Sequence, residues 1–578
     1  MQITCRAGAG RYNDINGRRH MTLLPIRSAA TALVQSLQAQ GVDLVFAVAG
    51  ESYLAVLNAL YEVRDQVRLV TCRHEANAAN MAEACGKLTG RPGVCFVTRG
   101  PGATHASIAL HTAQQDATPL VLFVGQVARA DLGRNAFQEI DFTIMFGGIA
   151  KWVAQITDPE MLPSVVAEAF QRAVSDRPGP VVISLPEDML DEPCTAPIAA
   201  QVTVIPRAVD LAVISSIARA LAKAKHPLVW VGGSGWTPEG VDALHAFISR
   251  WNLPVANGFR RKDLYPNSAP HYIGEFGFAA GTAVTAALKD ADLVLVIGAA
   301  LGDVETGGYM RLDPTIVHDR VIHVATCAED LNRVFKVRIG TYASPLSTCK
   351  ALVNLEAPVD MPWNGWTEHL RTLYLADLAP VPVTGDVNPS EVFLELRRQL
   401  PKDAIVANGA GNYAAWLHRF FQHDVFPTQL APQSGAMGYG VPAAIAAALL
   451  YPRRKVVAVS GDGCFMMAAN ELITAVSNGA DVVFLILNNG SFGTIRMHQE
   501  MRYPGRTHAT NLVNPDFVML AAATGIPAVR VTTTVGFSCA LSTALAANGP
   551  RLIELVTSVE DIAPNKRLSE LSGTKANG

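Results

Sequence analysis

A Gly-Asp-Gly turn and an Asn-Asn pair are the residues of this sequence whose types and spacing best suit chemistry. Gly461-Asp462-Gly463 follows an apolar run at Val456–Val459, and Asn488-Asn489 follows another at Val482–Leu487. Glycines let backbone amides approach a diphosphate, and a helix N-terminus favours its negative charge. A carboxylate and an amide oxygen are hard ligands suited to magnesium. The spaced pair predicts a magnesium–diphosphate site, whereas either motif alone is also a common turn or helix cap.

The elements that position these motifs are predicted by alternating apolar runs and helical patterns. Val456–Val459, a helix at Asn470–Asn478 and Val482–Leu487 form a βαβ unit, which places both motifs at the carboxyl edge of a buried parallel sheet. The same order occurs earlier, where a strand at Val94–Thr98 runs into a glycine turn, a helix and a strand at Leu120–Val124. This echo predicts related first and third domains, although α/β proteins contain such units by default.

Two proline-rich stretches, Asp191–Asp210 and Pro358–Asn388, read as linkers. A chain of 578 residues is long enough for three or four domains. We therefore expect three doubly wound parallel-sheet α/β domains, at residues 22–191, 205–352 and 385–560. An N-terminal extension at 1–21, with Met21 as an alternative start, and a C-terminal tail at 561–578 would flank them.

Composition excludes several classes of protein. The chain has 47 Lys and Arg against 50 Asp and Glu, which argues against a protein that neutralises nucleic-acid phosphates. Nine cysteines without a Cys-x-x-Cys pair argue against a disulfide framework or zinc site and favour a reducing compartment. No apolar run reaches the ~18 residues of a membrane span, and the N-terminus lacks a secretory signal. We expect a cytoplasmic protein that binds neither nucleic acid nor membrane.

The Gly-Asp-Gly to Asn-Asn segment resembles the thiamine-diphosphate-binding motif, and the likeness runs from about Leu24 to about Thr557, most similar to acetolactate synthases. Arg73-His74-Glu75-Ala76 resembles the family's His-Glu segment. Other matching segments are Gly100-Pro101-Gly102-Ala103-Thr104, with His105 in place of the family's Asn, Ala136-Phe137-Gln138-Glu139 with Lys151, and Gly435-Ala436-Met437-Gly438-Tyr439-Gly440-Val441-Pro442.

The resemblance implies that the first domain (22–191) binds the cofactor's pyrimidine and the third (385–560) its diphosphate, with a central domain (205–352) between them. It also implies a role for each matching residue. Magnesium would be held by Asp462, Asn489 and the Ser491 carbonyl, and Met437 would enforce a bent cofactor. The residues that would bind thiamine diphosphate are Gly50, Glu75, Gly411, Asn412, Gly435, Met437, Gly461, Gly463, Cys464, Asn489 and Gly493. The residues implied to be catalytic are Glu75, Gln138, Lys151 and His498. Glu75 would come from a partner subunit, so the resemblance implies a homodimer or tetramer with its active site at the dimer interface.

Each of these roles has a plainer alternative. A buried Glu75 with a raised pKa suits the proton transfer that activates the cofactor, whereas alone it reads as an exposed acid at a helix start. Met437 alone reads as core packing. Gln138 and Lys151 alone read as loop and surface residues.

The sequence departs from the family pattern at two places. His498 stands where synthases that make branched-chain amino acids carry a Trp, so it is either a proton donor or a polar residue at the pocket rim. In the central domain, only an Asp and Thr306-Gly307 survive from the flavin-binding motif. The Gly232-Gly233-Ser234-Gly235 loop and Arg260-Arg261-Lys262 suit phosphate contacts, or else form a glycine turn and a solvated basic patch. FAD and a remnant nucleotide site both stay open.

The leading hypothesis is a thiamine-diphosphate- and magnesium-dependent carboligase that decarboxylates a 2-oxo acid such as pyruvate and forms a C–C bond. A decarboxylase or lyase of another 2-oxo or 2-hydroxyacyl substrate, including a CoA thioester, is the nearest alternative. A flavin- or nicotinamide-dependent oxidoreductase, such as a 2-oxo acid oxidase, is less favoured because no convincing Gly-x-Gly-x-x-Gly is present. A silent paralogue conflicts with the joint presence of Glu75, Asp462 and Asn489. A regulatory subunit stays undetermined.

Overall fold

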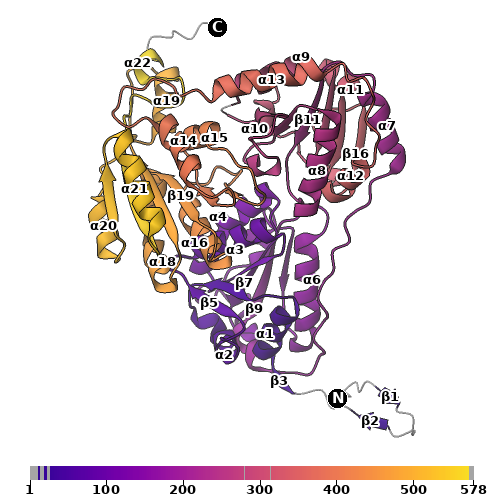
Figure 1. Ribbon diagram of the computed structural model, residues 1–578. Helices are drawn as coiled ribbons and strands as arrows, with labels where there is room; N and C mark the ends of the chain where they lie inside the picture. Colours follow the sequence, from indigo (N-terminus) through magenta and orange to yellow (C-terminus); the bar gives the residue numbers. More distant parts are fainter. Residues whose placement is uncertain (1–10, 14–18, 22–25, 279, 313, 572–578) are drawn as a thin grey trace.

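Three six-stranded parallel sheets, each flanked by helices, form the protein (Figure 1), as predicted. The computed structural model describes residues 11–13, 19–21, 26–278, 280–312 and 314–571. The expected extension at 1–21 lies largely outside the described residues. The central strands of the sheets are runs of buried aliphatic side chains because helices cover both faces.

The first and third sheets have the same strand order, and this confirms the predicted relation between their domains. The first sheet runs β5 (Arg68–Thr71), β4 (Leu44–Ala47), β6 (Gly93–Val97), β7 (Leu120–Gln126), β9 (Pro180–Pro186), β8 (Trp152–Gln155). The third runs β18 (Gln429–Leu430), β17 (Ile405–Asn408), β19 (Val456–Gly461), β20 (Val482–Asn488), β22 (Arg551–Val556), β21 (Ala528–Val531). If the six strands of each sheet are numbered along the chain, both sheets have the spatial order 2-1-3-4-6-5.

The central sheet has a different order. Its first three strands run from the middle of the sheet to one edge, and its last three run from the middle to the other edge. It runs β13 (Tyr272–Glu275), β12 (Val255–Asn257), β11 (Pro227–Val231), β14 (Leu293–Ile297), β15 (Val321–Ala325), β16 (Ile339–Tyr342). The point of reversal lies between β11 and β14, where open α/β sheets commonly bind ligands.

Helices α3 (Glu75–Thr89) and α16 (Gly440–Leu450) join the first and third domains and lie side by side in Figure 1. Their small, largely alanine side chains belong to one continuous buried cluster, which lets the helices approach closely. The Tyr439 hydroxyl donates to Glu83 at 2.5 Å, and Lys87 is paired with Asp116 and donates to the Ala431 carbonyl at 2.8 Å. These buried contacts fix the first domain against the third.

The second predicted linker is wrong, because Pro358–Asn388 contains helix α13 (Asn364–Asp377). Trp363, just before the helix, is fully buried and its indole N–H donates to the Trp251 carbonyl at 2.8 Å. The helix packs on β13 and α9 (Thr282–Asp290) of the central domain.

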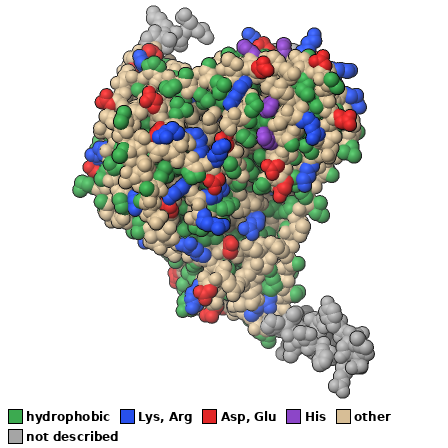
Figure 2. Space-filling model, viewed as in Figure 1, with side chains coloured by type: hydrophobic (Ala, Val, Ile, Leu, Met, Phe, Trp, Pro, Cys, Tyr) green, Lys and Arg blue, Asp and Glu red, His purple; other side chains and the backbone are tan. Residues whose placement is uncertain are grey.

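In the part of the chain that the structure describes, no helix has the length and apolarity to cross a membrane. On the face shown in Figure 2, basic and acidic side chains are interspersed.

Candidate active site

A cavity of about 260 Å³ lies at the carboxyl edge of the third sheet. It opens where β17, β19 and β20 end and where helix α19 (Gly493–Arg502) begins. Eleven predicted residues line it: Gly411, Asn412, Gly435, Met437, Gly461, Asp462, Gly463, Cys464, Asn489, Ser491 and Gly493. The structure therefore brings together every cofactor and metal residue that the sequence predicted in the third domain.

Oxygen atoms suited to a hard cation meet in this cavity. The Asp462 carboxylate is nearly fully buried, and its Oδ2 accepts a hydrogen bond from Asn514 Nδ2 at 2.7 Å. Burial raises the pKa of Asp462, and the hydrogen bond from Asn514 opposes that rise. Asn489 Oδ1 accepts from the Ser491 N–H at 3.1 Å, which holds the turn after β20. A carboxylate, an amide oxygen and a backbone carbonyl form a donor set that fits magnesium.

Asn514 is a site residue that the sequence reading missed. Its amide also donates to Asn488 Oδ1 at 3.0 Å, so it links the two predicted motifs. The only signal was an Asn-Pro-Asp segment before helix α20 (Phe517–Ala523), which reads as an ordinary helix start. Asp561 and Ile562 were also missed, because they were assigned to the C-terminal tail yet line the cavity.

The glycines of the cavity keep space for a ligand. A Cβ at Gly463 would lie 2.5 Å from the Phe492 ring, so the turn after β19 tolerates no side chain. Gly435 has a φ of +70°, which a larger residue adopts only with strain. Helix α19 begins at Gly493, and its N-terminal amides favour an anion in the cavity. The geometry fits a diphosphate with a bridging divalent cation.

Glu75 lies in a separate cluster at the carboxyl edge of the first sheet. It begins helix α3, and its Oε2 lies 2.8 Å from Nδ1 of His105 on helix α4 (Pro101–Asp116). The His74 ring stacks on the His105 ring with centroids 4.5 Å apart, and His74 Nδ1 accepts from the Ala76 N–H. The Glu75 side chain is 13% exposed, whereas the His105 side chain is 51% exposed. Glu75 lines neither the cavity described above nor its neighbour.

Two other predicted residues lie at the same edge of the first sheet as Glu75. Gly50 follows β4, and a Cβ there would come within 2.6 Å of the Thr98 side chain. Gln138 has a φ of +64°, and its backbone packs against Gly100, where a Cβ would lie 2.8 Å from the Gln138 carbonyl oxygen. The sheet edge thus gathers Gly50, Glu75 and Gln138, apart from the residues of the cavity.

Lys151 lies elsewhere, because it precedes β8 at the amino edge of the first sheet. Its ammonium donates to the carbonyls of Arg172 at 2.6 Å and Ser175 at 2.7 Å. These bonds satisfy backbone acceptors at the end of helix α6 (Leu162–Val174). The structure does not bring Lys151 to Glu75 or Gln138.

A second cavity, of about 530 Å³, adjoins the first between the central and third domains. Gly411, Asn412, Gly435 and Thr494 line both cavities, which makes the two volumes neighbours. His498, an exposed residue of α19, lies along the second cavity with Met497 and Met501. From the central domain, Phe259, Arg260 and Lys262 contribute to the same wall.

The reversal point of the central sheet does not offer an open phosphate cradle. A Cβ at Gly233 would lie 2.0 Å from the Gly298 carbonyl oxygen, so the loops after β11 and β14 are in backbone contact. The Trp236 indole N–H donates to the Gly232 carbonyl at 2.8 Å and closes the turn. The 232–235 loop lines neither cavity. These residues do not fit an extended dinucleotide.

The basic triplet of the central domain is not a solvated patch, and that prediction is wrong. Arg260, Arg261 and Lys262 are 6%, 7% and 2% exposed, respectively. They are buried because the third domain covers the loop after β12: Lys262 Nζ donates to the His418 and Phe421 carbonyls at 2.5 and 2.6 Å.

Comparisons with known proteins agree with this geometry. Family models described as the N-terminal, central and C-terminal domains of thiamine pyrophosphate enzymes match residues 27–145, 214–352 and 409–555. The acetolactate synthase large subunit of Parasynechococcus marenigrum is 31% identical over 544 residues, 91% of this chain and 87% of that protein. The isozyme 2 large subunit of Escherichia coli is 30% identical, over 93% and 97% of the two chains. The acetolactate synthase of Arthrospira platensis is 32% identical, over 94% and 98%.

Proposed function

Because the chain belongs to the thiamine pyrophosphate (thiamine diphosphate) enzyme family, in its acetolactate synthase branch, we propose that it is a magnesium-dependent carboligase of 2-oxo acids. It would decarboxylate pyruvate or a related 2-oxo acid and join the acyl unit to a second carbonyl. The observation that carries this proposal is the single cavity in which the eleven predicted cofactor and metal residues of the third domain meet. When bound there, thiamine diphosphate supplies the electron acceptor that lets carbon dioxide leave a 2-oxo acid.

The residues of the third domain would bind and orient the cofactor. Asp462, Asn489 and the Ser491 carbonyl would hold magnesium, and Asn514 would orient the Asp462 carboxylate through its 2.7 Å hydrogen bond. Met437 and Ile562 are apolar members of the wall that would exclude water from the reacting carbons. Water exclusion favours C–C bond formation over protonation by solvent.

Glu75 would hold a proton against the pyrimidine ring of a cofactor bound to a second copy of the chain. This assignment is supported by its exclusion from both cavities of its own chain and by the exposed His105 beside it. The protein would then be a homodimer or a larger assembly of dimers, with two subunits completing each site.

A mixing experiment tests this shared site. E75Q and D462A should each be inactive alone, but a refolded or co-expressed mixture should regain about a quarter of wild-type activity, because random pairing leaves one intact site in each mixed dimer. No regained activity in verified mixed dimers would place Glu75 and Asp462 in the same chain's site.

Two of the three other residues predicted to be catalytic would contact the substrate. Gln138, at the edge of the first sheet, and His498, along the second cavity, would contact substrate, whereas Lys151 is held by two carbonyls and has no role in this proposal. The Trp that His498 replaces favours 2-oxobutyrate as second substrate, so this proposal includes no preference for that acceptor. No flavin step is included, because the central loops do not fit a dinucleotide.

The cysteines described are free and, except Cys539, buried, which supports a reducing compartment such as the cytoplasm.

Cofactor extraction followed by a panel of 2-oxo acids with product identification tests the function. Released thiamine diphosphate, with acetolactate or acetoin formed from pyruvate, is the expected result. Thiamine diphosphate without either product, but with cleavage of a 2-hydroxyacyl substrate, would instead identify a lyase. A yellow chromophore in the purified protein would contradict the exclusion of a flavin.

A further inference from the structure

Arg260 is a buried arginine on the wall of the larger cavity. It follows β12 with a φ of +61°, an uncommon conformation for a residue with a side chain, and its backbone N–H donates to the Glu275 carboxylate. It is 6% exposed and lines the larger cavity. Its Nη1 donates to the carbonyl of Pro432, close in sequence to Gly435, which lines both cavities.

The guanidinium has no anionic partner among the residues that the structure describes. No carboxylate lies within 4.0 Å of it, and its Nε has no acceptor. The carboxylates whose charges act on Arg260, Glu275 and Asp116, have other partners. Glu275 lies 3.1 Å from His418 Nδ1. Asp116 is paired with Lys87 and accepts a hydrogen bond from the Gln433 N–H. Burial lowers the pKa of Arg260. A buried, unpaired guanidinium is unfavourable unless an anion completes it.

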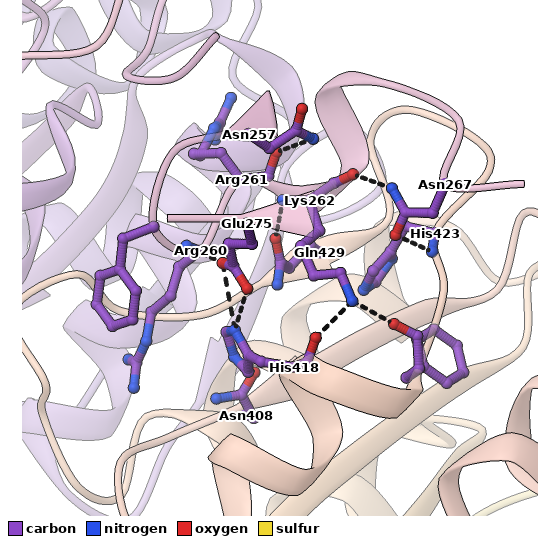
Figure 3. A network of polar contacts seen from close by, with 12 residues as sticks. Asn257, Arg260, Arg261, Lys262, Asn267, Glu275, Asn408, His418, His423 and Gln429 are labelled. Carbon is purple, nitrogen blue, oxygen red and sulfur yellow. Dashed lines mark hydrogen bonds and ion pairs between the residues drawn. The ribbon is translucent and has the colours of Figure 1, made fainter. Parts of the chain in front are cut away.

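The neighbouring basic residues differ from Arg260 in this respect. Lys262 is fixed by the carbonyls of His418 and Phe421, and burial lowers its pKa to about 8. Figure 3 shows the Arg260 side chain leading away from these contacts, and Arg261 pointing to yet another side. Arg261 lines neither cavity. The Arg260 guanidinium contacts the Pro432 carbonyl and lies over the Phe259 ring, with its Cζ 4.9 Å from the ring centroid. Arg260 is therefore the arginine of the triplet that lines a cavity, and it has no anionic partner among the described residues.

From this arrangement we infer that Arg260 binds the carboxylate of the 2-oxo acid substrate. The inference rests on the proposed function, since it assigns that carboxylate to the cavity beside the cofactor residues. A guanidinium suits a carboxylate because its N–H donors form charge-assisted hydrogen bonds with it. Bound substrate would supply the negative charge that the surrounding protein does not. Arg260 would thereby select charged 2-oxo acids over neutral carbonyl compounds of the same shape.

Calorimetric titration of the holoenzyme with two non-reacting pyruvate analogues tests this inference. Oxamate carries the carboxylate, and oxamide is its neutral counterpart. R260M should weaken oxamate binding by ~10- to 100-fold, the range of a lost charge-assisted contact, while oxamide binding stays within about two-fold. R261M is the matched control, because it removes an equally buried guanidinium from the next position, and it should change neither affinity.

The outcomes separate this inference from the proposed function. Equal loss for both analogues, loss for neither, or the same loss of oxamate in R261M would overturn it, as would Arg260-dependent binding of inorganic phosphate in place of oxamate. If R260M does not fold, the wild-type protein and R260K decide: wild type must bind oxamate at least about ten-fold more tightly than oxamide, and R260K must narrow that ratio of affinities. Arg260-dependent oxamate binding in a protein that turns over no 2-oxo acid would contradict only the proposed function.

Discussion

The first and third domains share a strand order but present different chemistry at the same sheet edge. The third closes glycines, amides and one carboxylate into a cavity, where Asp462 is 3% exposed. The first presents Glu75 and two histidines on an open face, where the His105 side chain is 51% exposed. The backbone therefore supplies equivalent positions, and the loop residues decide what each position does. We therefore call the carboxyl edge of the third sheet the enclosed edge, and the carboxyl edge of the first sheet the open edge.

The largest effect should come from breaking the enclosed edge. Asp462→Ala removes the only carboxylate predicted to hold magnesium, so magnesium-dependent cofactor affinity should fall by more than ~100-fold, as calorimetry would measure. Asp516→Ala is the matched control: Asp516 caps helix α20 nearby, so its loss should lower stability slightly without altering that affinity. Unaltered cofactor affinity in Asp462→Ala would show that the metal site is wrongly assigned.

Breaking the open edge should spare binding and remove turnover. Glu75→Gln keeps the size of the side chain but loses its proton, so turnover should fall ~100- to 10,000-fold while cofactor affinity changes little. Steady-state kinetics and calorimetry on the same preparation measure the two quantities. Glu51→Gln, an exposed position near the same edge, should leave both unchanged. Near-normal turnover in Glu75→Gln would remove Glu75 from the mechanism.

The enclosed edge was more predictable from sequence than the open one. A βαβ unit forces the residues after successive parallel strands to one edge, so Asp462 and Asn489 follow directly from local pattern. Asn514 escaped prediction because its contact with Asp462 depends on a loop that returns from farther along the chain. Lys151 and Arg260 could not be placed, because their environments depend on backbone carbonyls that no side-chain pattern encodes.

Prolines explain the failed prediction in the fold. Pro358 and Pro362 precede helix α13, and Pro380 and Pro382 follow it, so they bracket the helix and do not interrupt it. Burial of the Arg260–Lys262 triplet likewise depends on the third domain, more than a hundred residues later in the chain. Long-range packing of this kind leaves no periodic signal in the sequence.

A smaller effect should follow from disturbing only the support of the enclosed edge. Asn514→Ala removes the hydrogen bonds to Asp462 and Asn488 and leaves the proposed metal ligands in place. Magnesium affinity of the holoenzyme should fall ~10- to 100-fold, the usual cost of losing a residue that orients a metal ligand. Asn514→Asp should be worse, because a second carboxylate would lie against Asp462. Calorimetric magnesium titration measures both variants. Wild-type magnesium affinity in Asn514→Ala would show that the Asp462 carboxylate keeps its orientation without Asn514.

The smallest effect should come from His105→Asn, which places an amide beside Glu75 at the open edge. The asparagine amide can still donate to the Glu75 carboxylate, so turnover at its optimum should stay within about ten-fold of wild type. Steady-state kinetics at the optimum of each protein measure this turnover. Two titratable groups contact His105: Glu75 through the 2.8 Å hydrogen bond and His74 through ring stacking. His74→Asn is therefore the control that separates them. A loss of turnover greater than about ten-fold in His105→Asn, without the same loss in His74→Asn, would mean that the imidazole supports Glu75 by more than this one hydrogen bond.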